Sequence, residues 1–346
     1  MTATCLGCGL ACDDIRVTVK NGRIAEAVNA CALGVQWFGT GQVPSRVRIR
    51  GGDADRAAAL AEAARILTGA KRPFVYLGAD LSTDAQRAAC ELADVLGALI
   101  DTMTPAAGIL AIQERGRCSA TFGEIRHRAD VVVLWHLDPD NAYPRLRSRY
   151  LPGLHFLSVD DVDAALARAA VLGHASNPQA KALADRLAVS KYVAIIVDGE
   201  TRSGDIEALL ALTEALNGPT RAALVILRRV GAESVLTWQT GYPKAIDFAR
   251  GYPRYVPYNR HEFDAALIVG SGTAFDGVPT IVIGPRASEA MAPASVALDT
   301  GLAGIHDGGA AVRTDDITVP LRPPLPGIVP ETAATVRELT ALVRRS

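Results

Sequence analysis

The chain has 346 residues, of which 49% are hydrophobic and 21% charged, and its formal net charge is −1. This composition is that of a folded globular protein, and at about 150 residues per domain the length predicts two or three domains. The near-zero charge gives no support to nucleic acid or an anionic membrane as partner. No apolar run approaches the roughly 18 residues of a spanning helix, and residues 1–14 lack the features of a secretory leader. We therefore expect a soluble, cytoplasmic protein.

Residues 1–50 form the first predicted unit, a small β structure. The pair Asn21-Gly22 stands between two alternating apolar runs, at 16–19 and 23–28, which is typical of a two-residue hairpin turn. The unit also contains four of the six cysteines, which are Cys5, Cys8, Cys12 and Cys31. We expect a short β domain that carries a cysteine loop.

From residue 51 the pattern changes to helices that alternate with short buried strands. The predicted strands are 72–78, 129–135 and 155–159, and the predicted helices are 53–67, 82–97 and 164–172. Alternation of this kind predicts a parallel, doubly wound sheet. We assign residues 51–175 to a first α/β domain, which residues 301–346 rejoin.

A second set of elements begins near residue 191. Its predicted strands are 192–197, 223–227, 265–269 and 280–283, with a helix at 205–216. We assign residues 176–300 to a second α/β domain, in which 294–299 is a strand that returns toward the first. The predicted fold class is α/β, with a small N-terminal cysteine-loop β unit and two doubly wound, Rossmann-like domains.

The cysteines carry the strongest chemical signal in the sequence. Cys5, Cys8, Cys12 and Cys31 follow the spacing C-x2-C-x3-C-x18-C. A disulfide framework is not expected in a reducing compartment, whereas thiolates that converge suit a [4Fe–4S] cluster or tetrahedral zinc. Gly7 would let the backbone wrap closely around a cluster, and so would Gly9 in the same loop. The spacing favours iron–sulfur over zinc, and thiols without metal are the third alternative.

Other candidate residues are assigned structural roles. Cys90 is expected to be a small core residue of a helix, and Cys118 a loop residue. His155 is expected to be a satisfied core residue of a strand. Asp13 and Asp14 are interpreted as a solvated turn or helix cap rather than an acid/base couple. The sequence contains no Walker loop, no nucleophile elbow and no histidine spacing of a hydrolytic metal site.

Five segments together resemble one known family. They are residues 4–15, 29–38, 120–150, 239–257 and 304–316. They are similar to the B subunit of formylmethanofuran dehydrogenase and to its bacterial counterpart in the formyltransferase/hydrolase complex. Segment 120–150 is the most specific, with family residues at Gly123, Glu124, Arg128, Asp130, Trp135, Pro139, Pro144, Arg145 and Arg149. The resemblance implies a shortened molybdopterin-oxidoreductase fold.

The resemblance also implies where the redox members bind their metal. Those members carry tungsten or molybdenum on a bis-pterin, bound by a cysteine or selenocysteine that a histidine follows. The matching stretch here is 101–105, so that Thr102 replaces the ligand and Met103 the histidine. A hydroxyl is a hard, neutral donor that cannot replace a thiolate on this soft centre. We therefore expect no tungstopterin or molybdopterin and no catalytic residue, and His136 replaces a glycine that follows Trp135 in the family.

The expected function is that of a structural subunit without its own active site. By resemblance, the complex converts formyl-tetrahydromethanopterin to formate through a formyl-methanofuran-type carrier, in formaldehyde oxidation and one-carbon metabolism. The expected partners are its hydrolase, formyltransferase and carrier-binding subunits. Two alternatives stay open: an active B subunit of a tungsten or molybdenum formylmethanofuran dehydrogenase, and an iron–sulfur electron-transfer module.

Overall fold

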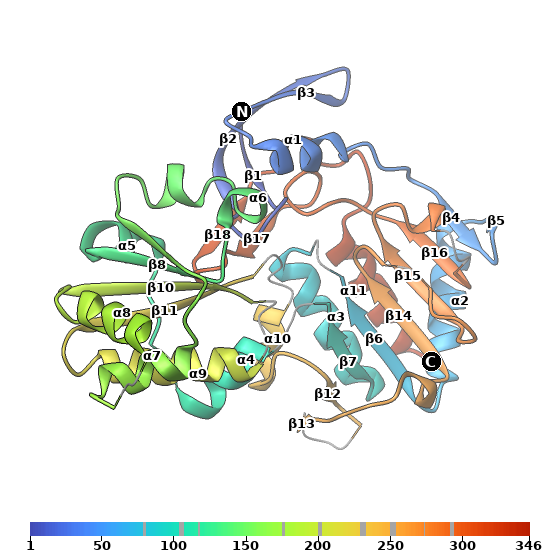
Figure 1. Ribbon diagram of the computed structural model, residues 1–346. Coiled ribbons are helices and arrows are strands. Elements are labelled where there is room, and N and C mark those ends of the chain that lie inside the picture. Colours follow the sequence, from blue (N-terminus) through green and yellow to red (C-terminus); the bar gives the residue numbers. More distant parts are fainter. Residues whose placement is uncertain are drawn as a thin grey trace.

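The structure is a computed structural model. It describes residues 1–78, 81–103, 107–116, 118–174, 177–199, 203–228, 233–249, 254–272, 274–290 and 294–346. Two α/β bodies lie side by side, one built on a four-stranded sheet and the other on a nine-stranded sheet, and the N-terminal β unit lies above them in the view of Figure 1. In the described part of the chain, no helix combines the length and the apolar character needed to cross a membrane.

The N-terminal unit is an antiparallel sheet followed by a short helix. Its strands are β1 (Thr2–Cys5), β2 (Cys12–Lys20) and β3 (Arg23–Val28), in that order, and α1 (Ala32–Gly39) follows. Asn21 and Gly22 both have left-handed backbone conformations, with φ of 51° and 70°, as the tight hairpin turn requires. The predicted hairpin is confirmed.

The nine-stranded sheet has the order β13-β12-β7-β6-β14-β15-β16-β4-β5. Its five central strands are parallel, and they are β6 (Pro73–Leu77), β7 (Leu99–Thr102), β14 (Ala265–Val269), β15 (Thr280–Gly284) and β16 (Val296–Asp299). The outer strands are β4 (Val47–Ile49), β5 (Gly52–Asp53), β12 (Ile246–Asp247) and β13 (Arg254–Tyr255). Such an arrangement, parallel at the centre and antiparallel at the edges, is common in large α/β sheets.

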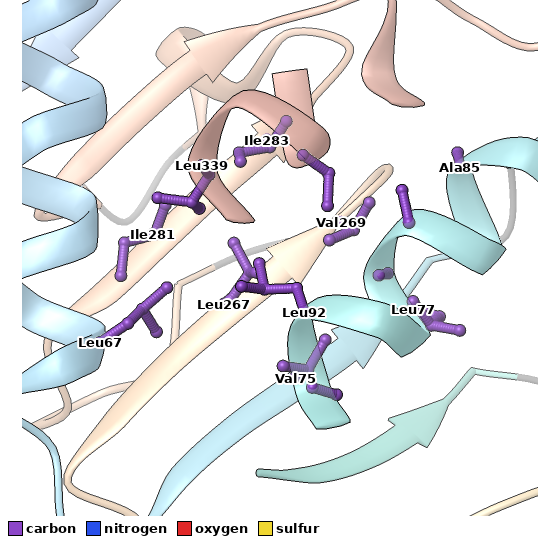
Figure 2. Packing of buried hydrophobic residues seen from close by; sticks show 14 of the residues in the cluster. Leu67, Val75, Leu77, Ala85, Leu92, Leu267, Val269, Ile281, Ile283 and Leu339 are labelled. Atoms are coloured by element: carbon purple, nitrogen blue, oxygen red, sulfur yellow. The ribbon is translucent and has the colours of Figure 1, made fainter. Parts of the chain in front are cut away.

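Three helices cover one face of this sheet. They are α2 (Arg56–Thr68), α3 (Thr83–Leu96) and α11 (Thr332–Val343). Figure 2 shows Leu67, Leu92 and Leu339 of these helices beside strand residues such as Leu267 and Ile281. The cluster contains every second residue along these strands, because successive side chains of a strand point to opposite faces of the sheet.

Local signals fix the ends of α3. The Ser82 hydroxyl accepts a hydrogen bond from the N–H of Ala85, and Gly97 ends the helix in the left-handed conformation. The predicted helix at 82–97 is confirmed. Asp55 caps α2 in the same way, by accepting from the N–H of Ala58.

The four-stranded sheet is parallel throughout, in the order β11-β10-β8-β9. Its strands are β8 (Val131–Trp135), β9 (Phe156–Val159), β10 (Tyr192–Asp198) and β11 (Arg221–Leu227). Helices α4 (Ala107–Arg115), α7 (Ala164–Val171), α8 (Pro178–Ala188) and α9 (Ser203–Leu216) pack on one face. The opposite face shares a hydrophobic cluster with α5 (Phe122–Arg128) and with the N-terminal unit.

Shorter elements connect these bodies. They are α6 (Pro139–Ala142), a π-helical turn (Leu146–Tyr150), α10 (Glu233–Thr240), the antiparallel pair β17 (Gly309–Val312) and β18 (Thr318–Leu321), and two 3-10 turns (Arg260–Glu262, Ala287–Glu289). The tail after β18 leads to α11, which packs against α2 and α3.

The assignment of strands to sheets differs from the prediction. The α/β class is confirmed, but β6 and β7 pair with strands from residues 265–299, and β8 and β9 pair with β10 and β11. The reason is that each of these strands is a short apolar run, and such a run carries no information about its partner. The predicted domain boundaries at residues 50, 175 and 300 stay predictions.

Candidate functional site

The four cysteines predicted as metal ligands lie at the ends of neighbouring elements. Cys5 ends β1 and Cys12 begins β2, and the two residues pair across the strands. Cys8 lies in the turn between these strands, and Cys31 is the N-cap residue that immediately precedes α1. The first three side chains are buried and that of Cys31 is half-buried. The fold of the N-terminal unit therefore brings all four into one region.

A glycine lets the backbone of α1 approach two of these thiols closely. A Cβ added to Gly34 in α1 would lie 3.3 Å from Sγ of Cys5 and 3.9 Å from Sγ of Cys31. The same Cβ would lie 3.2 Å from Cβ of Ala30. Gly34 is therefore a packing requirement where α1 approaches these thiols closely.

The electrostatics of Cys5 confirm that the four thiols are close. Burial is the main cause that raises the pKa of the Cys5 thiol to about 12, and the neighbouring thiols of Cys8, Cys12 and Cys31 also raise it. A hydrogen bond from the N–H of Gly7, 3.4 Å from Sγ, acts in the opposite direction. A thiol in this state is protonated at neutral pH, and a metal would have to displace its proton to bind.

Gly7 has a packing role in the protein itself, and its predicted role around a cluster stays a prediction. Its added Cβ would lie 2.8 Å from the carbonyl oxygen of Leu33 and 3.2 Å from Cβ of Trp37. Gly7 therefore lets the cysteine loop approach the backbone of α1 closely, which is a packing requirement of the protein itself.

The thiols do not have the geometry of a single-ion site. Over the described residues, no group of three or more His, Cys, Asp and Glu side chains is arranged to hold a metal ion. A tetrahedral zinc needs all its sulfur ligands about 2.3 Å from one point. The four thiols are thus gathered in one region without converging on one point.

Asp13 and Asp14 form ion pairs with the segment that follows α6. The guanidinium of Arg145 donates two hydrogen bonds to Asp14, at 2.7 and 2.8 Å, and Arg149 donates one to Asp13 at 2.7 Å. Burial raises the pKa of Asp14, but the hydrogen bond from Arg145 and the charges of Arg149 and Arg145 outweigh it, so that this pKa is lowered. The prediction of a solvated turn or cap is wrong, because these carboxylates tie β2 to residues 145–149.

A second set of contacts completes this junction. The hydroxyl of Tyr150 donates to the carbonyl of Leu10 at 2.7 Å, and the guanidinium of Arg313 lies 5.1 Å from the Tyr150 ring centre. Arg313 is paired with Asp315 at 2.6 Å. Three of the segments that resemble the known family, 4–15, 120–150 and 304–316, therefore meet here.

The position expected to have lost a metal ligand lies at the end of β7. Thr102 is fully buried, and its carbonyl oxygen accepts a hydrogen bond from Nζ of Lys244 at 3.4 Å, while Met103 is 54% exposed. The Lys244 ammonium is 3.9 Å from Asp101, which also accepts a hydrogen bond from the hydroxyl of Tyr258. None of these described groups is the thiolate or selenolate that the resemblance implies as the ligand of tungsten or molybdenum in the redox members. Residues 104–105 of the predicted stretch lie outside the described residues.

The structure also describes the other candidate residues, which are two cysteines and two histidines. Cys90 is confirmed as a core residue, with 3% exposure, and Cys118 is exposed in a loop. His155 is exposed and lies 2.5 Å from Arg186, so its prediction as a core residue is wrong, because β9 begins one residue later. His136 has φ of 46°, which keeps the left-handed backbone of a glycine, and its side chain is exposed.

The chain is similar to proteins of two named kinds, although no protein-family model matches it. It is 28% identical to the B subunit of tungsten-containing formylmethanofuran dehydrogenase 2 of Methanocaldococcus jannaschii, over 94% of both chains. It is 29% identical to the B subunit of the formyltransferase/hydrolase complex of Methylorubrum extorquens, over 65% of this chain and 72% of that relative. The first alignment extends over 413 positions, more than this chain has residues, so that relative contains additional segments.

A solved structure has the same fold. A chain in the crystal structure of the formyltransferase/hydrolase complex from Methylorubrum extorquens, in complex with methylofuran, matches with a TM-score of 0.74 and 24% identity. The match covers 86% of this chain and 99% of that chain. The resemblance inferred from the five sequence segments is confirmed: the chain is similar to the B subunits of formylmethanofuran dehydrogenase and of the formyltransferase/hydrolase complex.

Proposed function

We propose that this chain is a non-catalytic structural subunit of a formyltransferase/hydrolase complex in one-carbon metabolism. The complex would convert formyl-tetrahydromethanopterin to formate through a formyl-methanofuran-type carrier, with this chain as its B-type component in the cytoplasm. The observation that carries the proposal is Thr102, which is buried beside the Lys244 ammonium where a redox relative would need a soft ligand.

The length of the chain supports the same conclusion. The tungsten-containing relatives align only when additional segments are allowed in them, and the relative in the Methylorubrum complex has the same fold. A shortened chain with hard groups at the ligand position suits a scaffold that partner subunits cover. The partners would be the hydrolase, formyltransferase and carrier-binding subunits.

The test is to purify the complex with and without this chain. We expect the intact complex to hydrolyse formyl carrier without stoichiometric tungsten or molybdenum, and we expect deletion of the chain to prevent assembly of the remaining subunits. A Cys118→Ser variant, altered in an exposed loop, is the control that should assemble normally. One tungsten or molybdenum per chain would instead establish the dehydrogenase alternative, and an assembled, active complex without the chain would exclude the scaffold role.

For the cysteine region we propose a [4Fe–4S] cluster held by Cys5, Cys8, Cys12 and Cys31. The proposal is supported by the burial of three of these thiols, by the proximity of the other three thiols to Cys5 and by the spacing of the four residues in the sequence. A bound cluster would supply folding free energy to the N-terminal unit and a one-electron couple. The chain's own part is to hold four thiolates at the junction of β1, β2 and α1.

Metal analysis of anaerobically purified protein decides between the three alternatives. The cluster predicts about four irons and matching sulfide per chain, with broad visible absorbance. Cys31→Ser should lower the iron content and expose the N-terminal hairpin to protease, whereas Cys90→Ala, at a buried helix position away from the loop, should leave the iron content unchanged. About one zinc per chain would favour the zinc site, and no metal would reject both.

A further inference from the structure

Two of the four gathered cysteines lie directly opposite each other in the N-terminal sheet. Strands β1 and β2 are antiparallel, and their register pairs Cys5 with Cys12. Opposite residues of an antiparallel pair have Cα atoms about 4.5–5.5 Å apart and side chains on the same face. A disulfide needs about 4.4–6.8 Å between the Cα atoms of its two cysteines. The backbone of this pair therefore already has the spacing of a disulfide.

The other two thiols of the region are placed differently. Cys8 lies in the turn between β1 and β2, and Cys31 precedes α1. Among the described residues, Cys5 and Cys12 are the two cysteines that a strand register sets opposite each other. All four are free thiols in the structure. The register thus selects one pair out of the four.

Contacts beside the pair hold both strands in place. The hydroxyl of Thr4, next to the first cysteine, donates a hydrogen bond to the carbonyl of Pro320 at 2.7 Å. Asp14, two residues after the second cysteine, accepts two hydrogen bonds from Arg145. These contacts involve no metal. The two strands are therefore fixed at this register by the protein itself.

Burial favours a bond within the chain over a bond to another molecule. Cys5 is 6% exposed and Cys12 is 5% exposed, and both belong to the hydrophobic cluster that reaches the four-stranded sheet. A small thiol attached to either sulfur would have to fit into this packed region. The thiol on the opposite strand is in position to displace it by thiol–disulfide exchange. Oxidation of either cysteine should therefore end in a bond between the two.

The expected bond is one that reductants can open again. Opposite Cβ atoms are about 4.5–5.5 Å apart, whereas a disulfide needs about 3.5–4.5 Å, so the strands must approach by about 1 Å. Disulfides that depart from their preferred geometry are more easily reduced. In intracellular proteins, disulfides are usually transient and often sense the redox state.

We propose that Cys5 and Cys12 of the metal-free chain form a reversible disulfide, with a low-molecular-weight disulfide such as oxidised glutathione as the oxidant. The two thiols lose two protons and two electrons, a bond forms between their sulfur atoms, and oxidised glutathione is cleaved to two glutathione thiols. The oxidised chain then lacks two of the four ligands of the cluster proposed above. The disulfide does not depend on that cluster, whereas its effect on iron uptake rests on it.

Thiol mapping of the full-length, metal-free protein tests the disulfide. The protein is equilibrated without oxygen in glutathione buffers of increasing oxidised fraction, and the remaining thiols are alkylated in acid. Trypsin leaves Cys5, Cys8 and Cys12 in one peptide, residues 1–16, and Cys31 in another. We expect the first peptide to be lighter by two hydrogen atoms, with Cys8 and Cys31 alkylated. A bond to Cys8 or Cys31, a stable glutathione adduct, or fully alkylated cysteines in the most oxidising buffer overturns the proposal.

Variants separate the pair from its neighbours. The double variant Cys8→Ser/Cys31→Ser should form the disulfide in the same buffers as the unaltered protein, and Cys12→Ser should form none, while circular dichroism confirms that both are folded. Cys90→Ala, at a buried position of α3, is the control and should oxidise like the unaltered protein. A folded double variant that fails to oxidise, or a folded Cys12→Ser variant that still forms a bond from Cys5, overturns the proposal.

Iron uptake tests the consequence for the metal site. After anaerobic incubation with iron and sulfide, the oxidised chain should hold at least about ten-fold less iron than the reduced chain, because a disulfide cannot supply thiolate ligands. Dithiothreitol should restore uptake. Equal uptake by both forms overturns this control of the site. A reduced chain that takes up no iron overturns the cluster and this control together, and the thiol map still decides whether the disulfide forms.

Discussion

The nine-stranded sheet and the N-terminal cysteine unit are stabilised in different ways. The sheet closes a large aliphatic cluster of its own with α2, α3 and α11 (Figure 2). The buried residues of the cysteine unit belong instead to a cluster that they share with the four-stranded sheet. The sheet is thus an independent core, whereas the N-terminal unit depends on a surface that another body supplies.

The polar contacts show the same difference. The N-terminal unit is joined to residues 145–150 by a bidentate Arg145–Asp14 pair, an Arg149–Asp13 pair and a hydrogen bond from Tyr150. The stabilisation from buried aliphatic groups sums over many contacts and depends little on the geometry of any one of them. Each of these polar contacts, in contrast, requires one partner in one geometry. Mutations in the sheet should therefore change global stability, and mutations at the junction should release the N-terminal unit first.

The largest expected effect lies in the sheet. Leu267 is fully buried on the central strand β14, and Leu267→Ala would remove an isopropyl group and leave a cavity. We expect a loss of about 2–5 kcal/mol in the free energy of unfolding, measured by urea titration. Val95→Ala, on the exposed side of α3, is the matched control and should have a small effect. An equally small effect of Leu267→Ala would contradict an independent aliphatic core.

A smaller and more local effect is expected at the junction. Arg145 is 16% exposed in its side chain, and Arg145→Ala would leave Asp14 half-buried without its bidentate partner. We expect a loss of about 1.5–3 kcal/mol, from the range for hydrogen bonds to charged groups. Limited proteolysis should detect cleavage in the β2–β3 hairpin before the rest of the protein.

An exposed ion pair of the same form provides the control. Arg65 donates two hydrogen bonds to Glu62, at 2.6 and 2.7 Å, but its side chain is 65% exposed. We expect Arg65→Ala to have no measurable effect, because solvent screens such pairs. If both variants behaved alike, the junction would not depend on its ion pairs.

Features that neighbouring residues decide could be predicted from the sequence, and pairings between distant segments could not. The hairpin at Asn21-Gly22 and the limits of α3 at Ser82 and Gly97 were predictable, because a turn or a cap is decided by residues adjacent in sequence. The partners of β6 and β8 were not, since both are short apolar runs without a signal for pairing.

In the candidate site, the gathering of the cysteines followed from their spacing. The Asp14–Arg145 pair did not, because its residues are 131 positions apart and each charge alone is typical of a solvated surface.

The smallest expected effect is a pH dependence of the free energy of unfolding that arises from His306. His306 is 2% exposed, and its Nδ1 accepts a hydrogen bond from the N–H of Leu302 at 3.2 Å. Burial lowers the pKa of His306, and a backbone contact with Gly41 opposes the shift only partly. The folded protein therefore favours the neutral imidazole.

The sign of the effect follows from proton binding. Below the ordinary histidine pKa of about 6.5, the unfolded chain binds a proton that the folded chain takes up only at lower pH, so the free energy of unfolding falls as the solution is acidified. The contribution of His306 is complete above that value and is lost progressively between about pH 6.5 and the lowered pKa of the folded protein. His306→Asn keeps an acceptor for Leu302 but does not ionise. We expect urea titrations at pH 7 and pH 5 to show a smaller loss for this variant than for the unaltered protein. His127→Asn, at an exposed position of α5, should behave like the unaltered protein. Equal losses in all three proteins would show that burial of His306 is not linked to stability.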